Sequence, residues 1–170
     1  MIKAIKVMLV PNNVQRTKMF QYAGAARFAY NWALAKENEN HNNGGKFISD
    51  SELRKEFTKL RNSNEYSWLQ NISNNVTKQA IKDACAAYKN FFKGLQKYPV
   101  FKSKKKSKPK FYQDNVKIQF SDTHVKLERF SLSRKHNKQK LNWVRLAERG
   151  RIPTDTKYMN PRVSFDGLNW

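Results

Sequence analysis

The sequence has few acidic residues, a single cysteine and no long apolar run. Its 170 residues hold 13 Asp and Glu against 34 Lys and Arg, which leaves a formal net charge of +21. One cysteine, Cys85, excludes an internal disulfide and a CxxC zinc site, and we expect it in the apolar interior. No segment approaches the roughly 18 apolar residues of a membrane span, and no signal peptide is recognisable. We therefore expect a cytoplasmic protein with no membrane partner.

The few acidic residues and histidines form no pattern typical of a catalytic site. A two-metal nuclease needs several carboxylates that converge on one point, whereas the acids here stand apart in turn-like contexts. The histidines lie in polar surroundings without a partner at ligand spacing, and no Gly-rich phosphate loop or nucleophile motif occurs. We predict no catalytic residue and no metal site in this chain. The residues considered were Asp122, Asp155, Asp166, His41, His124 and His136.

The abundant positive charge indicates a polyanionic partner, and for a domain of this size that partner is first a nucleic acid. Residues 97–110, KYPVFKSKKKSKPK, carry seven lysines and no acid, and aromatic residues follow them. Lysines beside aromatic rings suit a phosphate backbone with a stacked base; a disordered, solvated linker or a localisation signal is the alternative. A second basic segment lies further on. The predicted RNA-binding residues are Lys102, Lys104, Lys105, Lys106, Lys108, Phe111, Tyr112, Arg134, Lys135, Lys138 and Arg145.

Apolar periodicity predicts one strand, then helices, then a run of short strands. A lone first strand would leave exposed edges, so we favour a β domain interrupted by helices over two sequential domains. The predicted fold class is α+β: a small OB-like β-barrel, formed by residues 1–12 and 98–170, with a helical bundle of residues 13–97 inserted after the first strand. Strands are expected at 2–10, 116–120, 125–127, 143–146 and 163–165, and helices at 14–39, 49–61 and 73–96.

The helix expected at 73–96 has an apolar stripe and an opposite polar face. At its N-terminal end this face carries Asn75, Lys78, Gln79 and Lys82. Asn and Gln can bond adenine bidentately, and Lys can reach guanine, in the major groove of DNA. We predict that these four residues bind DNA; an ordinary polar helix face is the alternative.

Several short motifs resemble the N-terminal half of TnpB, the RNA-guided nuclease encoded by insertion sequences and related to type V CRISPR effectors. YPVFKSKK at 98–105 is the most specific of them. RFAYNW at 27–32, YKNFFK at 88–93 and VSFDGLNW at 163–170 support it. The resemblance covers essentially the whole chain and is weakest between 120 and 150.

The resemblance implies a β-barrel wedge domain and a helical recognition domain that bind guide RNA and double-stranded target DNA. The helix end at 75–82 would then help to read the motif beside the target, and the protein would lie on the bacterial nucleoid when bound to DNA. The chain stops where the RuvC-like nuclease domain of that family would begin, so its catalytic acids and four-cysteine zinc site are not expected here.

We therefore expect no enzyme activity from this chain alone. Magnesium would belong to the family's nuclease domain, and a separate RuvC polypeptide is a conceivable partner. Two alternatives remain open: a nuclease-less, RNA-guided DNA-binding regulator of transcription, and a general RNA-binding protein.

Overall fold

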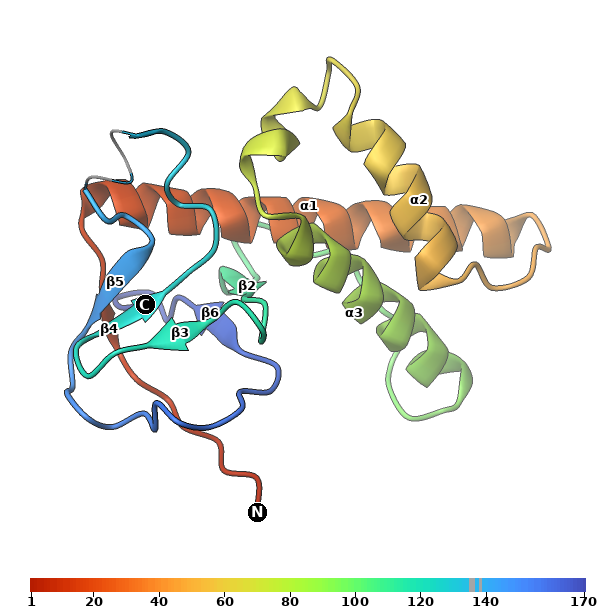
Figure 1. Ribbon diagram of the computed structural model, residues 1–170. Helices are drawn as coiled ribbons and strands as arrows, with labels where there is room; N and C mark the ends of the chain where they lie inside the picture. The colour runs from red at the N-terminus through yellow and green to blue at the C-terminus, as the bar shows by residue number, and fades with distance from the viewer. Residues whose placement is uncertain (135–136, 138) are drawn as a thin grey trace.

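The computed structural model, which describes residues 1–134, 137 and 139–170, is an α+β structure built on one long helix (Figure 1). The strands gather along the first part of this helix, and the other two helices lie along its second part. The helices are α1 (Asn13–Asn42), α2 (Asp50–Arg61), the short 3₁₀ helix η1 (Ser67–Asn71) and α3 (Asn74–Phe92). The strands are β1 (Leu9–Val10), β2 (Lys110–Tyr112), β3 (Gln119–Phe120), β4 (His124–Lys126), β5 (Trp143–Leu146) and β6 (Arg162–Ser164).

Helix α1 begins at a capping box and packs closely against its neighbours. The Asn12 side chain accepts from the Gln15 N–H at 2.8 Å, and the Gln15 side chain accepts from the Asn12 N–H at 3.0 Å. These bonds satisfy backbone donors that the first helical turn leaves unpaired. The helix packs against α3, and its buried residues include the small Ala25 and Ala29. The predicted helix is confirmed and extends slightly beyond both of its expected ends.

The strands form two small antiparallel sheets. One has the order β1-β5-β4-β3, with Leu9 opposite Leu146, and the other pairs β2 with β6, with Phe111 opposite Val163. The first strand is only two residues long, far shorter than the expected 2–10, but it does join the C-terminal strands. Barrel closure needs continuous pairing around the sheet. Across the described residues no closed barrel forms, so the OB-like barrel stays without confirmation.

Helices and sheets share one hydrophobic core. The buried Tyr22 of α1 meets Phe111 of β2 at 5.4 Å and Phe130 at 5.1 Å between ring centroids, both edge to face. Such ring pairs add to the apolar burial that stabilises a core. The proposed division into residues 13–97 and the remainder stays a prediction, but the two parts are packed together through α1.

Helix α3 ends four residues earlier than expected. Its C-cap is Lys93, and Gly94 follows with a φ of 71°, a conformation that suits glycine at a helix end. Leu95, which a helix extended to residue 96 would have included, therefore lies outside it and is 70% exposed. Cys85 is buried and free, as predicted. Over the part of the chain that the structure describes, no helix combines the length and apolar character needed to cross a bilayer.

Candidate nucleic-acid interface

The lysine-rich segment is anchored to α1 through its backbone. The Asn31 side chain donates to the Lys102 carbonyl at 2.8 Å and accepts from the Lys102 N–H at the same distance. Upstream, the Tyr98 hydroxyl donates to the Asn38 side chain, and Pro99 is buried. This anchor joins residues of RFAYNW and YPVFKSKK, two motifs that are far apart in the sequence. The lysines that follow Lys102 therefore extend from a backbone position that is fixed against α1.

Lys102 has the most unusual environment of the lysines in this segment. Its Nζ lies 3.6 Å from the centroid of the Tyr30 ring, within range of a cation–π contact. Burial lowers the pKa of Lys102 to about 8, and the charges of Lys110 and Arg162 add to the effect against the opposing influence of Asp83. The ammonium group is thus held in a place where positive charge is poorly compensated.

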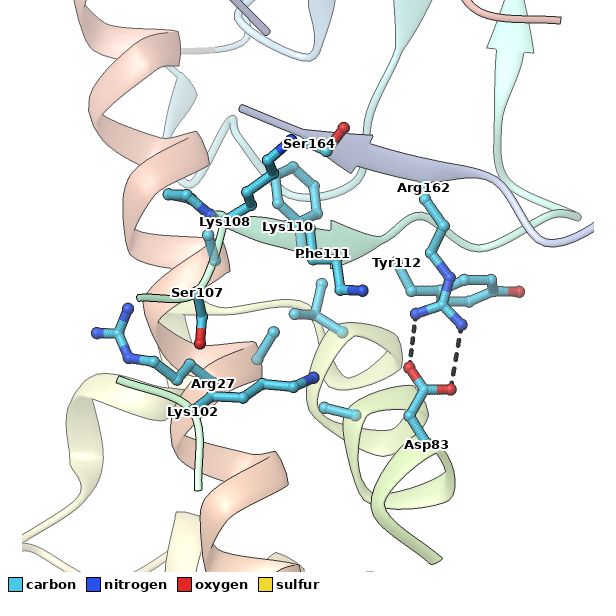
Figure 2. Close-up of a pocket in the computed structure, with 15 residues that line it drawn as sticks. Arg27, Asp83, Lys102, Ser107, Lys108, Lys110, Phe111, Tyr112, Arg162 and Ser164 are labelled. Atoms are coloured by element: carbon cyan, nitrogen blue, oxygen red, sulfur yellow. Dashed lines mark hydrogen bonds and ion pairs between the residues drawn. The ribbon is translucent and has the colours of Figure 1, made fainter. Parts of the chain in front are cut away.

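A pocket of about 510 Å³ opens beside Lys102, between α1, α3, β2 and β6 (Figure 2). Its floor is apolar and includes Val76, Ala80 and the buried Phe111. Its charged residues are five cations and one carboxylate: Arg27, Lys102, Lys108, Lys110, Arg162 and Asp83. Cations placed over an apolar wall interact with an anion more strongly than they would in open water.

The carboxylate of the pocket is already bound to one of its cations. Arg162 donates to Asp83 through two nitrogens, at 2.7 and 3.1 Å, and Gln79 donates to the same carboxylate at 3.0 Å. Sequence reasoning missed Asp83 and Arg162 because they lie 79 residues apart. The one available signal was Asp83 itself, an isolated acid on an otherwise basic helix face.

Lys104, Lys105 and Lys106 form an exposed turn beyond the pocket. The Ser103 hydroxyl accepts from the Lys106 N–H at 3.1 Å and fixes the start of the turn. No carboxylate of the described residues forms an ion pair with these three lysines. Their predicted contact with RNA phosphates stays a prediction, and the turn leaves all three free to make it.

Phe111 requires a correction, and Tyr112 is partly engaged. Phe111 is 1% exposed and packs among Tyr22 and Trp170, so its ring is not available to stack on a base as predicted. The alternation of the strand explains the error, because neighbouring residues of β2 face opposite sides. Tyr112 is half-buried, with the Arg162 guanidinium 5.4 Å from its ring centroid.

The predicted DNA-reading face of α3 divides into free and engaged residues. Lys78 and Lys82 are exposed. Asn75 donates to both oxygens of Glu128, at 3.1 and 3.2 Å, and Gln79 is bound to Asp83. Because the amide nitrogen of Asn75 is occupied by both oxygens of Glu128, Asn75 does not present the free bidentate edge that adenine recognition requires, and we correct its predicted role. Gln79 uses one of its two N–H donors for Asp83, so its predicted contact with DNA stays a prediction.

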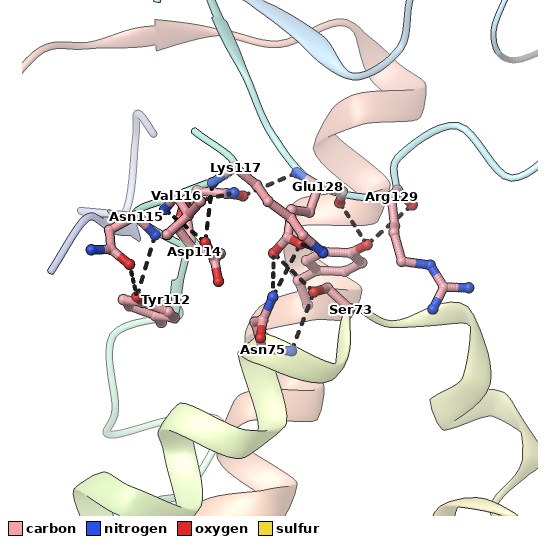
Figure 3. A network of polar contacts seen from close by, with 11 residues as sticks. Ser73, Asn75, Tyr112, Asp114, Asn115, Val116, Lys117, Glu128 and Arg129 are labelled. Carbon is pink, nitrogen blue, oxygen red and sulfur yellow. Dashed lines mark hydrogen bonds and ion pairs between the residues drawn. The ribbon is translucent and has the colours of Figure 1, made fainter. Parts of the chain in front are cut away.

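Glu128 is the centre of a buried polar network (Figure 3). Its carboxylate also accepts from the Ser73 hydroxyl at 3.0 Å and pairs with the Lys117 ammonium group at 3.0 Å. Its carbonyl accepts from the Tyr22 hydroxyl at 2.9 Å. The network ties the start of α3 to the loop after β4 and to α1. Buried carboxylates are tolerated when they are bonded in this way.

The second predicted basic patch lies apart from the first. Arg145 is exposed on β5 and lines a different hollow, which shares no residue with the pocket at Lys102. Arg134 is exposed as well, whereas Lys135 and Lys138 lie outside the described residues. Two separate cationic places are therefore available to a long polyanion.

The acidic residues do not make a metal site in the described part of the chain, where no group of three or more His, Cys, Asp or Glu residues comes together. Asp166 accepts from the Leu168 and Asn169 N–H groups and thereby closes a turn, as predicted.

Comparison with known proteins agrees with the resemblance that the motifs carry. Residues 1–46 match the family HTH_OrfB_IS605, described as a helix-turn-helix domain; in this structure they hold β1 and the single long helix α1. A protein of Escherichia coli (strain K12), InsQ, whose name makes it a candidate RNA-guided DNA endonuclease, is 32% identical over 143 residues. That match covers 84% of this chain and 36% of InsQ.

A Streptomyces pristinaespiralis protein with a similar name is 27% identical over 106 residues, which is 62% of this chain and 26% of that protein. The chain thus matches about a third of one relative and a quarter of the other.

Proposed function

We propose that this chain, a TnpB-like insertion-sequence protein, is the part of an RNA-guided DNA endonuclease that binds guide RNA and contacts target DNA. The names of its relatives imply both nucleic acids as partners. The formal charge of +21 supports the same kind of partner.

The observation that carries the proposal is the exposed cationic turn of Lys104, Lys105 and Lys106 beside the cationic pocket. The three lysines have no acidic partner among the described residues. Ammonium groups of this kind neutralise backbone phosphates and release the counterions condensed on them. We assign this surface to the guide RNA, together with Arg134 and Arg145.

We assign the exposed Lys78 and Lys82 of α3 to the target DNA. They project from the same helix whose start is fixed by the Glu128 network, so their positions relative to the rest of the chain are well defined. Because Asn75 and Gln79 are engaged internally, this face is better suited to phosphate contacts and a guanine contact through lysine than to adenine recognition.

DNA cleavage is a proposal for the whole endonuclease and not for these 170 residues. The relatives named as endonucleases are matched over about a third of their length or less. The described residues hold no carboxylate cluster, and a two-metal nuclease requires one. We expect the purified chain alone to leave DNA intact in the presence of magnesium, and we propose that a RuvC nuclease domain or polypeptide supplies the cleavage.

The function is tested by sequencing the RNA that co-purifies with the chain and then measuring DNA binding with that RNA bound. A single discrete RNA species, with binding to DNA that matches it, supports the proposal. A heterogeneous mixture of cellular RNA without DNA preference would instead identify a general RNA-binding protein. RNA-dependent repression of a matched promoter, in cells that have no associated nuclease, would identify a regulator.

A further inference from the structure

We propose that the pocket between α1, α3, β2 and β6 binds one backbone phosphate of single-stranded RNA, seated between the ammonium groups of Lys102 and Lys110. This inference rests on the proposed RNA-binding function and makes it specific. It distinguishes one built site from the diffuse contacts of the neighbouring exposed lysines.

The charges of the pocket are unbalanced in favour of an anion. Of its five cations, only Arg162 has a carboxylate within ion-pair distance among the described residues, and that carboxylate is Asp83. Lys102, Lys108, Lys110 and Arg27 are left without an acidic partner in the described chain. One phosphodiester charge would offset part of this excess.

The two principal cations are placed before any ligand arrives. The backbone of Lys102 is held by both atoms of the Asn31 amide, and its ammonium group rests over Tyr30. Lys110 begins β2 and is opposite Ser164 of β6, so its backbone is fixed by the sheet. Figure 2 shows both ammonium groups pointing into the same space, whereas the Arg27 guanidinium points away from Lys102. Placement of this kind reduces the ordering cost of binding.

The pocket also offers neutral donors and an apolar wall. The Ser107 and Ser164 residues line it beside the lysines, and Phe111, Val76 and Ala80 form its floor. Hydroxyl and ammonium donors over an apolar surface are a common way to recognise a phosphate oxygen. The volume of about 510 Å³ leaves room for the sugars on either side of the phosphate.

The electrostatics of Lys102 agree with this assignment. Its pKa is lowered by burial first and by the neighbouring Lys110 next. A phosphate between the two ammonium groups would replace part of the lost hydration and reverse the repulsion. Binding of an anion would therefore stabilise the pocket. The exposed turn at 104–106 does not require an anion in this way.

The test compares two lysines of the pocket with two lysines of the exposed turn. Lys102→Gln and Lys110→Gln remove one charge each from the pocket, and Lys104→Gln and Lys105→Gln remove one charge each from the turn. The affinity of the full chain for a fluorescent single-stranded RNA of about 20 nucleotides is measured by anisotropy at pH 7 and constant salt. We expect about a tenfold loss for each pocket variant, because charge-assisted bonds to a placed donor are lost, and less than about threefold for each turn variant.

Asp83→Asn provides a second variant whose expected effect has the opposite sign. It removes the carboxylate that holds Arg162, so the net positive charge of the pocket rises and RNA affinity should increase several-fold. A folding defect would lower the affinity instead. A folding defect could also explain a loss of affinity in Lys102→Gln. Lys110→Gln controls for it, because Lys110 is exposed and its substitution leaves the core intact.

The possible results separate this inference from the proposed function. Equal losses for pocket and turn variants, with no gain for Asp83→Asn, would overturn the phosphate site while leaving RNA binding in place. A wild-type chain that does not bind RNA would overturn both. Pocket variants that lose affinity for duplex DNA and keep it for RNA would also refute the assignment.

Discussion

The Glu128 network and the Lys102 pocket are both polar places beside α1, yet they are opposite in their balance of charge. Glu128 is buried and its carboxylate is bonded to Ser73, Asn75 and Lys117. In the pocket, cations outnumber the one carboxylate, and Lys102 keeps a lowered pKa. A saturated network holds the fold together, whereas an unbalanced one has capacity for a ligand. The difference separates residues that look alike in the sequence.

The largest expected effect is on stability, from Glu128→Ala. Its removal leaves Ser73 and Asn75 without their acceptor at the start of α3, and unsatisfied buried donors cost about 1–3 kcal/mol. We expect the free energy of unfolding to fall by about 3 kcal/mol in urea denaturation, with RNA affinity of the folded protein nearly unchanged.

Glu148→Ala is the matched control, because Glu148 also pairs with a cation but is half-exposed at the surface. Exposed pairs of this kind contribute less than about 1 kcal/mol. If the two substitutions cost the same, the Glu128 network is not the structural element that we describe.

The next effect is on RNA binding, from changing Lys104, Lys105 and Lys106 together to Ala. Each phosphate contact to a single strand contributes about 0.7 to the slope of log affinity against log salt. Loss of three contacts should therefore flatten the slope by about 2 and weaken binding by about 2 kcal/mol at low salt, given under about 1 kcal/mol for each exposed contact.

Lys46, Lys55 and Lys59, exposed lysines on and just before α2, form the control triple. Their removal changes the net charge by the same amount at another place. If the slope of log affinity against log salt changes equally in both triple variants, the turn at 104–106 is a solvated linker and not a specific RNA contact.

A smaller effect is expected from pH, through Lys102. Its pKa of about 8 means that the ammonium group is charged at pH 7 and mostly neutral at pH 9. The contribution of Lys102 to phosphate binding is therefore nearly complete at pH 7 and is lost as the pH rises through about 8, so that RNA affinity falls by about fivefold between pH 7 and pH 9.

The test of this pH dependence is a substitution at Lys102 itself. The charged groups that act on Lys102 are Lys110, Arg162 and Asp83, and burial raises the pKa of the Tyr30 hydroxyl so that it stays neutral. Lys102→Arg should remove the pH dependence, because a guanidinium is always charged. Anisotropy titrations at pH 7, 8 and 9 measure it; an unchanged pH profile in the Arg variant would contradict the role of Lys102.

The smallest expected effect is on DNA binding, and it compares an exposed residue of α3, Lys78, with an internally bonded one, Gln79. Lys78→Ala should weaken DNA binding by about 1 kcal/mol, at the lower end for a base contact, and leave RNA binding nearly intact. Gln79→Ala should do less, because its amide is bound to Asp83. Competition between matched and scrambled DNA measures both, and a larger loss for Gln79 would show that its bond to Asp83 is exchanged for a base.

Local pattern was sufficient to predict most of the elements. The strand at Trp143–Leu146 and the helices α1 and α2 lie close to where apolar spacing placed them. Gly94 ended α3 early, and only Leu9–Val10 of the first predicted strand is paired. A strand's length depends on the partner that it finds, and that partner, β5, lies more than 130 residues away.

The candidate site was predicted in part, for the same reason. A run of lysines is visible in the sequence, and so is the polar face of a helix. The contacts that remove Asn75 and Phe111 from the interface come from Glu128 and Tyr22, far along the chain. Arg162 became part of the pocket only through the pairing of β2 with β6. Sequence shows which residues could bind, and folding decides which of them remain free.

The unbroken length of α1 fixes the distance between the anchors of the two cationic places. Gln15, near its start, donates to the carbonyls of Leu141 and Trp143 beside Arg145, and Asn31 holds Lys102. The helical rise of about 1.5 Å per residue sets these two anchors about 24 Å apart along the helix axis. The RNA strand that we propose for these two cationic places would have to match this spacing.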